Sequence, residues 1–168
     1  MSYHVASRMI AARLSEPVRV VLVCTGNTCR SPMAEGMLRA MLAERGLSGD
    51  VEVSSAGTKD QPGKPASENA MAAVPGLEGH AARTFGPDEA SADHVWAMTP
   101  GNLEAVLPLA PHAELLLPDG EEVPNPYKGG PEEYAAAAAA IRTGLEARLP
   151  EIEMEVAALR GPEPGHHP

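Results

Sequence analysis

Two residues with reactive side chains, Cys24 and Arg30, lie six positions apart after the apolar, β-branched run at residues 18–23. The run predicts a buried strand. Ser31 and Pro32 predict the start of a helix, because serine caps helix N-termini well and proline suits the first helical position. A strand, a tight loop and a helix in this order direct backbone N–H groups and the positive end of the helix dipole at one point, where a phosphate fits.

The loop at residues 24–31 combines a nucleophile with a clamp for an oxyanion. Arg30 carries a planar, permanently charged fork that grips two phosphate oxygens. The field that holds a phosphate also favours the thiolate form of Cys24, and the Ser31 hydroxyl can donate to that sulfur. A structural turn with a buried cysteine is the alternative, but it has no use for an arginine aimed into its own loop. The predicted phosphate-binding residues are Thr25, Gly26, Asn27, Thr28, Cys29, Arg30 and Ser31.

The same loop resembles the signature of the low-molecular-weight protein tyrosine phosphatase family, which also contains bacterial protein arginine phosphatases and one class of arsenate reductases. The similarity covers roughly residues 18 to 150, and it implies a protein phosphatase in which Cys24 forms a phosphocysteine intermediate. The signature runs from Cys24 to Glu35, and the further matches are Ser55-Ala56-Gly57-Thr58, Gly79-His80-Ala81-Ala82-Arg83, Ala92-Asp93, Ala97-Met98-Thr99 and Pro126-Tyr127.

One position departs from the family pattern. Family enzymes place Asp-Pro-Tyr or Asp-Pro-Phe late in the chain, where the aspartic acid protonates the leaving group, but this chain has Asn125 before Pro126 and Tyr127. An amide cannot pass on a proton, so activity is expected to fall on the order of 10²–10⁴-fold. Three nearby acids are candidates for a surrogate, although such a cluster is more often a solvated turn; they are Asp119, Glu121 and Glu122.

Three features bear on the substrate. Phosphotyrosine members of the family have a bulky aliphatic residue where this chain has Thr28, whereas arginine phosphatases resemble it in having threonine, whose hydroxyl can orient a guanidinium. Residues 59–64 offer no aromatic ring to stack on a phenyl group. We expect Tyr127 at the substrate side as a second specificity residue. Asn125 argues against phosphoarginine, because a departing guanidine is very basic and needs its proton, although the Asn125 carbonyl oxygen could hold a guanidinium. Phosphotyrosine and phosphoarginine therefore both stay open, with a slight preference for phosphoarginine.

Other functions fit less well. A non-catalytic phosphate-binding pseudophosphatase is the main alternative, because Asn125 replaces the acid. An arsenate reductase is disfavoured, since thioredoxin-coupled members need cysteines beyond Cys24 and Cys29. The family resemblance implies that these two cysteines can form a disulfide under oxidation, and a packed, inert Cys29 is the equal alternative.

Composition limits the remaining possibilities. A chain of 168 residues suits one domain, and a net charge of −10 argues against binding to nucleic acid or to an anionic membrane. Two cysteines and no signal peptide indicate a reducing cytoplasm. Too few ligands are clustered for zinc, so we expect no metal and no cofactor, and a phosphorylated protein as the partner.

Apolar patterning predicts a four-stranded parallel sheet with a flavodoxin-like, doubly wound order and helices on both faces. The family resemblance implies an N-terminal extension at 1–17 and a phosphatase domain at 18–160, and residues 161–168 are expected to form a disordered tail. Ser55 is expected near the phosphate loop, and His80 and Arg83 are expected in structural roles. The predicted strands lie near 18–23, 51–54 (closing at 55–57), 94–98 and 114–117, and the predicted helices near 32–46, 66–74, 87–91, 100–107 and 131–159.

Overall fold

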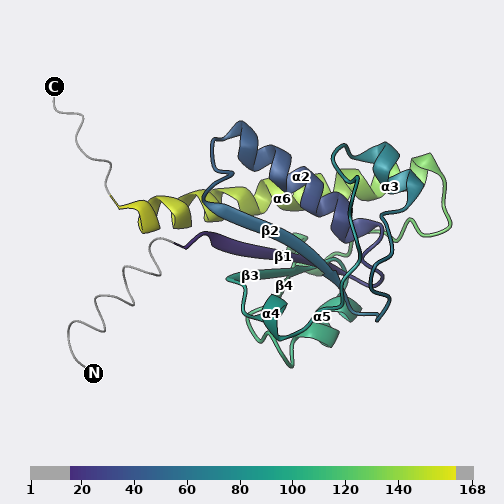
Figure 1. Ribbon diagram of the computed structural model, residues 1–168, viewed down its shortest axis with the longest axis horizontal. Coiled ribbons are helices and arrows are strands. Elements are labelled where there is room, and N and C mark those ends of the chain that lie inside the picture. Colours follow the sequence, from purple (N-terminus) through teal and green to yellow (C-terminus); the bar gives the residue numbers. More distant parts are fainter. Residues whose placement is uncertain (1–15, 162–168) are drawn as a thin grey trace.

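The computed structural model describes residues 16–161, which form an α/β domain around a parallel sheet (Figure 1). The sheet order is β2-β1-β3-β4, the flavodoxin-like order that right-handed crossovers favour, so the predicted fold class is confirmed. The strands are β1 (Val18–Cys24), β2 (Val51–Gly57), β3 (His94–Ala97) and β4 (Glu114–Leu115).

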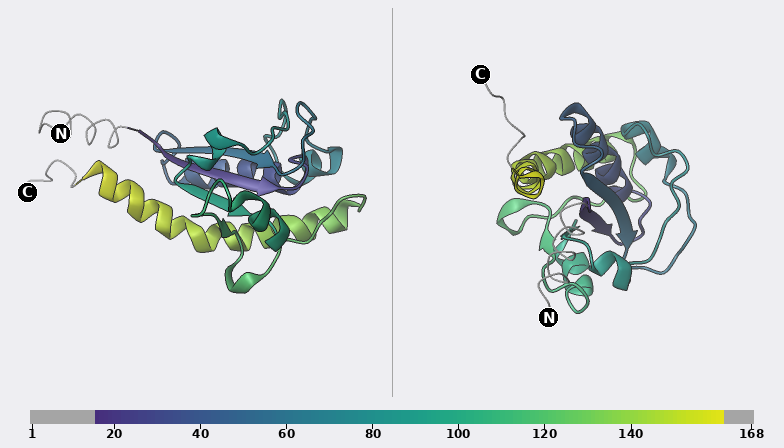
Figure 2. Two further views of the ribbon diagram at one scale, coloured as in Figure 1. Left: turned by 90° about the horizontal axis from the view of Figure 1, so that it is seen from below. Right: turned by 60° about the vertical axis from the view of Figure 1, so that its left-hand side comes forward.

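Helices cover both faces of the sheet (Figure 1). One side carries α2 (Arg30–Glu44), α3 (Glu68–Ala73) and α6 (Pro131–Arg160), and the other carries α4 (Pro87–Ala90) and α5 (Pro100–Val106). Figure 2 shows α6 running along the length of the domain, and the helix continues through Pro150 to Arg160. A 3-10 turn at Pro118–Gly120 precedes it.

The central strand β1 supplies side chains to two separate cores, because successive residues of a strand point to opposite faces. Val20 and Leu22 lie in the larger core beneath α2 and α6, whereas Val21 and Val23 lie in the smaller core with Val106 of α5. All four strand residues are buried. Burial on both faces explains the continuous apolar run that marked this strand in the sequence.

Two predicted boundaries were wrong. The helix that follows the loop begins at Arg30 with Cys29 as its N-cap residue, so Ser31 is inside the helix and does not cap it. Pro32 is still tolerated, because the first-turn N–H groups of a helix have no intrahelical partner. The last strand spans only Glu114–Leu115, two residues fewer than predicted. Residues 1–15 of the predicted extension and 162–168 of the predicted tail lie outside the described residues.

The C-terminal ends of β1 and β2 meet at the edge of the sheet that carries the site. Cys24 pairs with Gly57 in the parallel register, and the backbone N–H of Thr58 donates to Cys24 O at 3.0 Å. A Cβ at Gly57 would lie 2.7 Å from Thr25 O, so only glycine allows the two chain segments to approach this closely. The loop after Cys24 is therefore held tightly against the end of β2.

Candidate active site

The Cys24 sulfur lies at the centre of the loop between β1 and α2. It accepts a hydrogen bond from the backbone N–H of Asn27 at 3.2 Å, and the Ser31 hydroxyl contacts it at 2.9 Å. Cys24 and Ser31 are both buried. The Ser31 hydroxyl therefore does not cap the helix. It contacts the Cys24 sulfur, because Ser31 lies in the first turn of the helix and faces that sulfur.

Asn27 fixes the shape of the loop from behind. Its φ of 55° places it in the left-handed region, which asparagine tolerates better than most residues. The side-chain NH₂ donates to Ser31 Oγ at 2.8 Å and to Ser55 Oγ at 2.9 Å, and Oδ1 accepts from the Arg83 backbone N–H at 2.9 Å. His80 Nε2 lies 2.7 Å from Asn27 O. The structural role predicted for His80 and the position predicted for Ser55 are confirmed by these contacts.

Arg30 extends from the first residue of α2 toward the opposite side of the site. It is 5% exposed, and its Nη1 donates to Val123 O at 3.2 Å. Val123 in turn donates its N–H to Met98 O at the end of β3, at 2.9 Å. Arg30 is thereby braced by the loop that follows the sheet, and it lines the same cavity as Cys24.

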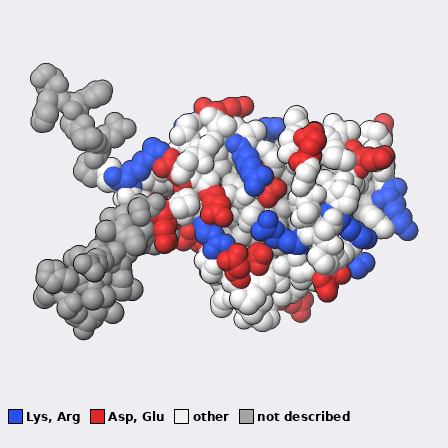
Figure 3. Space-filling model, viewed as in Figure 1, with Lys and Arg blue, Asp and Glu red and all other residues white. Residues whose placement is uncertain are grey.

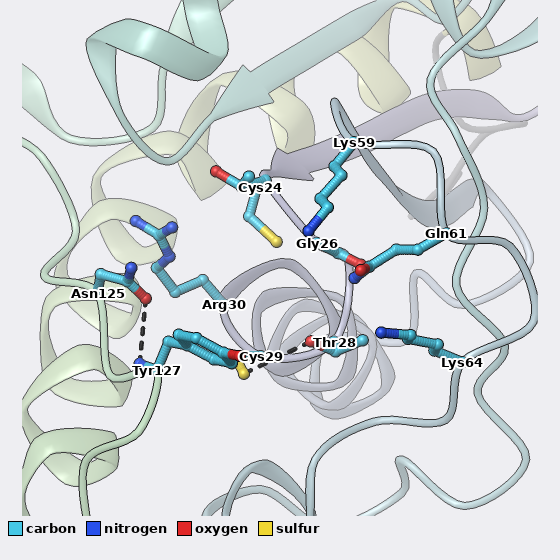
Figure 4. A pocket seen from close by; sticks show the side chains of 11 residues that line it. Cys24, Gly26, Thr28, Cys29, Arg30, Lys59, Gln61, Lys64, Asn125 and Tyr127 are labelled. Carbon is cyan, nitrogen blue, oxygen red and sulfur yellow. Dashed lines mark hydrogen bonds between the residues drawn. The ribbon is translucent and has the colours of Figure 1, made fainter.

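The cavity above the loop has a volume of about 260 Å³. Figure 4 shows the Cys24 sulfur between two groups of side chains, with Arg30 and Asn125 on one side and Lys59, Gln61 and Lys64 on the other. Asn27 and Ser31 do not line the cavity and act on it through Cys24. The lining residues are Cys24, Thr25, Gly26, Thr28, Cys29, Arg30, Lys59, Gln61, Lys64, Asn125 and Tyr127.

The cavity is cationic even though the whole chain is acidic. Three of its lining residues, Arg30, Lys59 and Lys64, are basic, and no carboxylate lines it within residues 16–161. Acidic and basic side chains are interspersed over the face of the molecule seen in Figure 3, so the charge of −10 is not gathered there into one large patch. The potential an anion meets at the site is therefore set locally.

The wall opposite the sulfur comes from the loop before α6. Asn125 is exposed, and its Oδ1 accepts from the Tyr127 backbone N–H at 3.1 Å. Tyr127 is 67% exposed, and Lys128 lies 5.6 Å from the centre of its ring. None of the three candidate surrogate acids lines the cavity; they are Asp119, Glu121 and Glu122.

One polar contact at the start of the loop was not predicted from the sequence. Asn102, near the start of α5, is 3% exposed and donates from Nδ2 to Thr25 Oγ1 at 3.0 Å. Its buried Oδ1 has no hydrogen-bond partner among residues 16–161. The Thr99-Pro100 pair predicted the start of this helix. Thr99 Oγ1 accepts a hydrogen bond from the Asn102 N–H at 3.1 Å, as predicted for an N-cap. Nothing in that pattern indicates that Asn102 also reaches Thr25.

The Cys29 sulfur has different neighbours from the Cys24 sulfur, which contacts Asn27 and Ser31. Its sulfur contacts the Tyr134 hydroxyl at 3.2 Å and Ser67 Oγ at 3.5 Å, and both cysteines are free thiols. Burial raises the pKa of Tyr134 above its ordinary value of 10.0, and the hydrogen bond with Cys29 raises it further. The structure thus shows Cys29 packed, whereas the disulfide with Cys24 under oxidation stays a prediction.

Residues 16–161 contain neither a membrane-spanning helix nor a cluster of metal ligands. No helix in this part of the chain is long and apolar enough to cross a membrane. Within the same residues, no three His, Cys, Asp or Glu side chains gather in a way that would hold a metal ion.

A buried thiol at the mouth of a strand–loop–helix unit, with an arginine in the same cavity, defines a class of cysteine-dependent proteins that handle phosphate. The chain belongs to the low molecular weight phosphotyrosine protein phosphatase family, whose model matches residues 19–158. The predicted family is thereby confirmed, and this family consists of phosphatases with a cysteine nucleophile.

Relatives of both substrate types are similar to the chain. A low molecular weight protein-tyrosine-phosphatase of Streptomyces coelicolor is 39% identical over 155 residues, covering 79% of this chain and 94% of the relative. A protein-arginine-phosphatase of Geobacillus stearothermophilus is 32% identical over 151 residues, covering 83% and 99%. A solved structure of the YwlE arginine phosphatase with a phosphorylated active-site serine matches with a TM-score of 0.73 and 25% identity, covering 84% of this chain and 99% of that one.

Proposed function

We propose that this protein is a protein phosphatase that transfers the phosphoryl group of its substrate to Cys24 and then to water, with phosphoarginine preferred over phosphotyrosine. The observation that carries the proposal is the Cys24 sulfur itself, which accepts a hydrogen bond from the Asn27 N–H, contacts the Ser31 hydroxyl and shares a cavity with Arg30.

The reaction has two displacement steps. Cys24 Sγ attacks phosphorus, so that an S–P bond forms and the P–N or P–O bond of the substrate breaks, with its electron pair leaving on nitrogen or oxygen. Water then attacks phosphorus and loses a proton, the S–P bond breaks, and inorganic phosphate and the thiolate are released. Arg30 and the loop N–H groups stabilise the three equatorial oxygens in both steps. The phosphorylated serine in the YwlE structure supports a phosphoryl group at this position.

The departing group must obtain its proton without a carboxylic acid. Asn125 lines the cavity where the family places an aspartic acid, and no carboxylate of residues 16–161 lines it. Water is then the proton donor, and we expect turnover below that of an acid-assisted enzyme by about 10²–10⁴-fold. A departing guanidine is very basic and needs a proton, but a phosphoramidate nitrogen can take one from water, so phosphoarginine stays open as the substrate.

The wall of the cavity supports phosphoarginine. Thr28 contributes a hydroxyl where an aliphatic side chain would suit a phenyl ring, and the loop after β2 contributes Lys59, Gln61 and Lys64 without an aromatic ring. Tyr127, largely exposed on the other wall, is the one aromatic residue that lines the cavity within residues 16–161.

A non-catalytic phosphate-binding protein is the second candidate, and Asn125 is the observation that favours it. Steady-state assays with 4-nitrophenyl phosphate, a phosphotyrosine peptide and a phosphoarginine protein separate the two. Turnover that disappears in Cys24→Ser, together with mass analysis that finds phosphate on Cys24, supports the enzyme. Tight binding of inorganic phosphate with no turnover of any substrate contradicts it and supports the binder.

A further inference from the structure

The loop after β2 sends one amide side chain into the wall of the active-site cavity. Gln61 is half-buried, lines the cavity, and donates from Nε2 to Gly26 O at 2.7 Å (Figure 4). Because a carbonyl oxygen only accepts hydrogen bonds, the NH₂ end of the amide must face Gly26. The other end, Oε1, accepts no hydrogen bond from any residue between 16 and 161, so an acceptor beside the cavity is available to a ligand.

A second polar group lies next to this amide. A Cβ added at Gly26 would lie 2.6 Å from Gln61 Nε2 and 3.5 Å from Thr28 Oγ1, so both side chains border the same point above Gly26. The Thr28 hydroxyl also lines the cavity. The rim of the nucleophile loop therefore presents the Thr28 hydroxyl and the Gln61 amide on one wall, with the amide nitrogen held by Gly26 O and the amide oxygen at its other end.

An amide oxygen on the cavity wall suits one kind of substrate group better than the other. A guanidinium is planar and carries N–H donors and no acceptor, so it can donate to the amide oxygen and to hydroxyl oxygens such as that of Thr28. A phenyl ring offers no donor and would cover the amide oxygen without pairing it, which costs binding free energy. We propose that Gln61 is a specificity-determining residue that accepts a hydrogen bond from the guanidinium of phosphoarginine, with Thr28 as its neighbour. The inference rests on the proposed function.

The basic residues of the same wall account for selection against unmodified arginine. Lys59 and Lys64 line the cavity together with Arg30 and would repel a bare guanidinium. A phosphoryl group reverses this effect, because its oxygens are attracted to the same cations. Gln61 thus accepts a hydrogen bond from the guanidinium, and the three basic residues favour binding of the phosphorylated form over unmodified arginine.

Binding measurements on a Cys24→Ala background test the inference independently of turnover. The probes are N-acetyl-phosphoarginine amide and N-acetyl-phosphotyrosine amide, titrated by calorimetry at neutral pH. Adding Gln61→Met removes the acceptor and the contact with Gly26, and is expected to weaken phosphoarginine binding about tenfold while phosphotyrosine binding changes much less. Gln61→Lys retains a donor for Gly26 O but offers no acceptor, and is expected to give the same selective loss.

The matched control is Lys64→Met, on the same wall, which is expected to weaken binding of both probes by a similar factor. The quantity that decides is the ratio of phosphoarginine affinity to phosphotyrosine affinity. If Gln61→Lys keeps this ratio at its starting value, with or without a change in Gln61→Met, the inference is overturned, because the only role of Gln61 would then be its hydrogen bond to Gly26. Where Gln61→Met does not fold, Gln61→Lys decides. Absence of turnover in the wild-type chain would contradict the proposed function, whereas the ratio of the two binding affinities would still test the role of Gln61.

Discussion

The two loops that face each other across the cavity are held very differently. In the nucleophile loop, residues 24–31, the polar side chains of Asn27, Arg30 and Ser31 are 5% exposed or less, and each is hydrogen-bonded. In the opposite loop, residues 118–130, Asn125 is exposed and its amide accepts only a hydrogen bond from its own loop within the described residues. The first loop is preorganised by the fold, whereas position 125 of the second loop can change its side chain without loss of the contacts that Val123 makes with Arg30 and Met98.

This contrast explains where the departure from the family pattern lies. A change at Asn27 would break contacts with β2 and with the chain around Arg83, so the fold itself opposes it. A change at position 125 alters an exposed turn, and in the proposed mechanism its cost falls on proton transfer. The loop that is proposed to bind the phosphoryl group keeps its internal contacts, beside a cavity wall without a carboxylate within residues 16–161.

Replacement of the nucleophile is expected to have the largest effect. Cys24→Ser leaves the loop contacts possible but removes the thiolate, so kcat for 4-nitrophenyl phosphate is expected to fall by about 10⁴-fold or more. Cys29→Ser is the matched control, because its sulfur faces Tyr134 and Ser67, and its loss should be far smaller. Similar losses in both variants would contradict the assignment of Cys24 as the attacking sulfur.

The same chemical change in the two loops tests the difference in their structural support. Asn27→Ala removes three side-chain hydrogen bonds and leaves alanine at a φ of 55°, so the free energy of unfolding is expected to fall by about 4 kcal/mol. Asn125→Ala removes one exposed contact and is expected to change it by about 0.5 kcal/mol or less. Urea denaturation of both variants measures this, and comparable losses would show that the loops are equally supported.

Restoring an acid in the opposite loop is expected to raise activity. Asn125→Asp should increase kcat for a phosphotyrosine peptide by about 10²-fold, because the carboxylic acid can then protonate the leaving oxygen. The gain should be smaller with 4-nitrophenyl phosphate, whose phenolate leaves without a proton, and it should decline as pH rises and the acid ionises. Asn125→Ala controls for loss of the amide, and an equal gain in that variant would argue against proton donation as the cause.

The contrast between the loops also sets what could be predicted from the sequence. The order of the sheet and the nucleophile loop were predictable, because the apolar run of β1 and the Thr99-Pro100 pair are local signals. Ser31-Pro32 gave the same local signal, but the cap predicted at Ser31 was wrong, while the predicted contact of its hydroxyl with Cys24 is present in the structure.

Contacts between distant segments left no trace in the sequence. Gln61 lies 35 residues from Gly26, and Asn102 lies 77 residues from Thr25, so no spacing rule relates either pair. Both contacts exist because the loops after parallel strands gather at one edge of the sheet. The chemistry that depends on one loop could be predicted, and the specificity that depends on several loops could not.

The smallest expected effect concerns the contact that links the nucleophile loop to α6. Tyr134→Phe removes a hydroxyl that contacts Cys29 and Ser67, which should lower the free energy of unfolding by about 1 kcal/mol at pH 8. Since the folded state raises the pKa of Tyr134, the neutral phenol is favoured by folding, and this contribution is present below pH 10 and is lost as pH rises above it. Urea denaturation at pH 8 and at about pH 10.5 should therefore show a smaller difference between wild type and variant at the higher pH. A difference that is constant or larger there would mean that the phenol is not held in its neutral form, and that Cys29 is tied to α6 by packing alone.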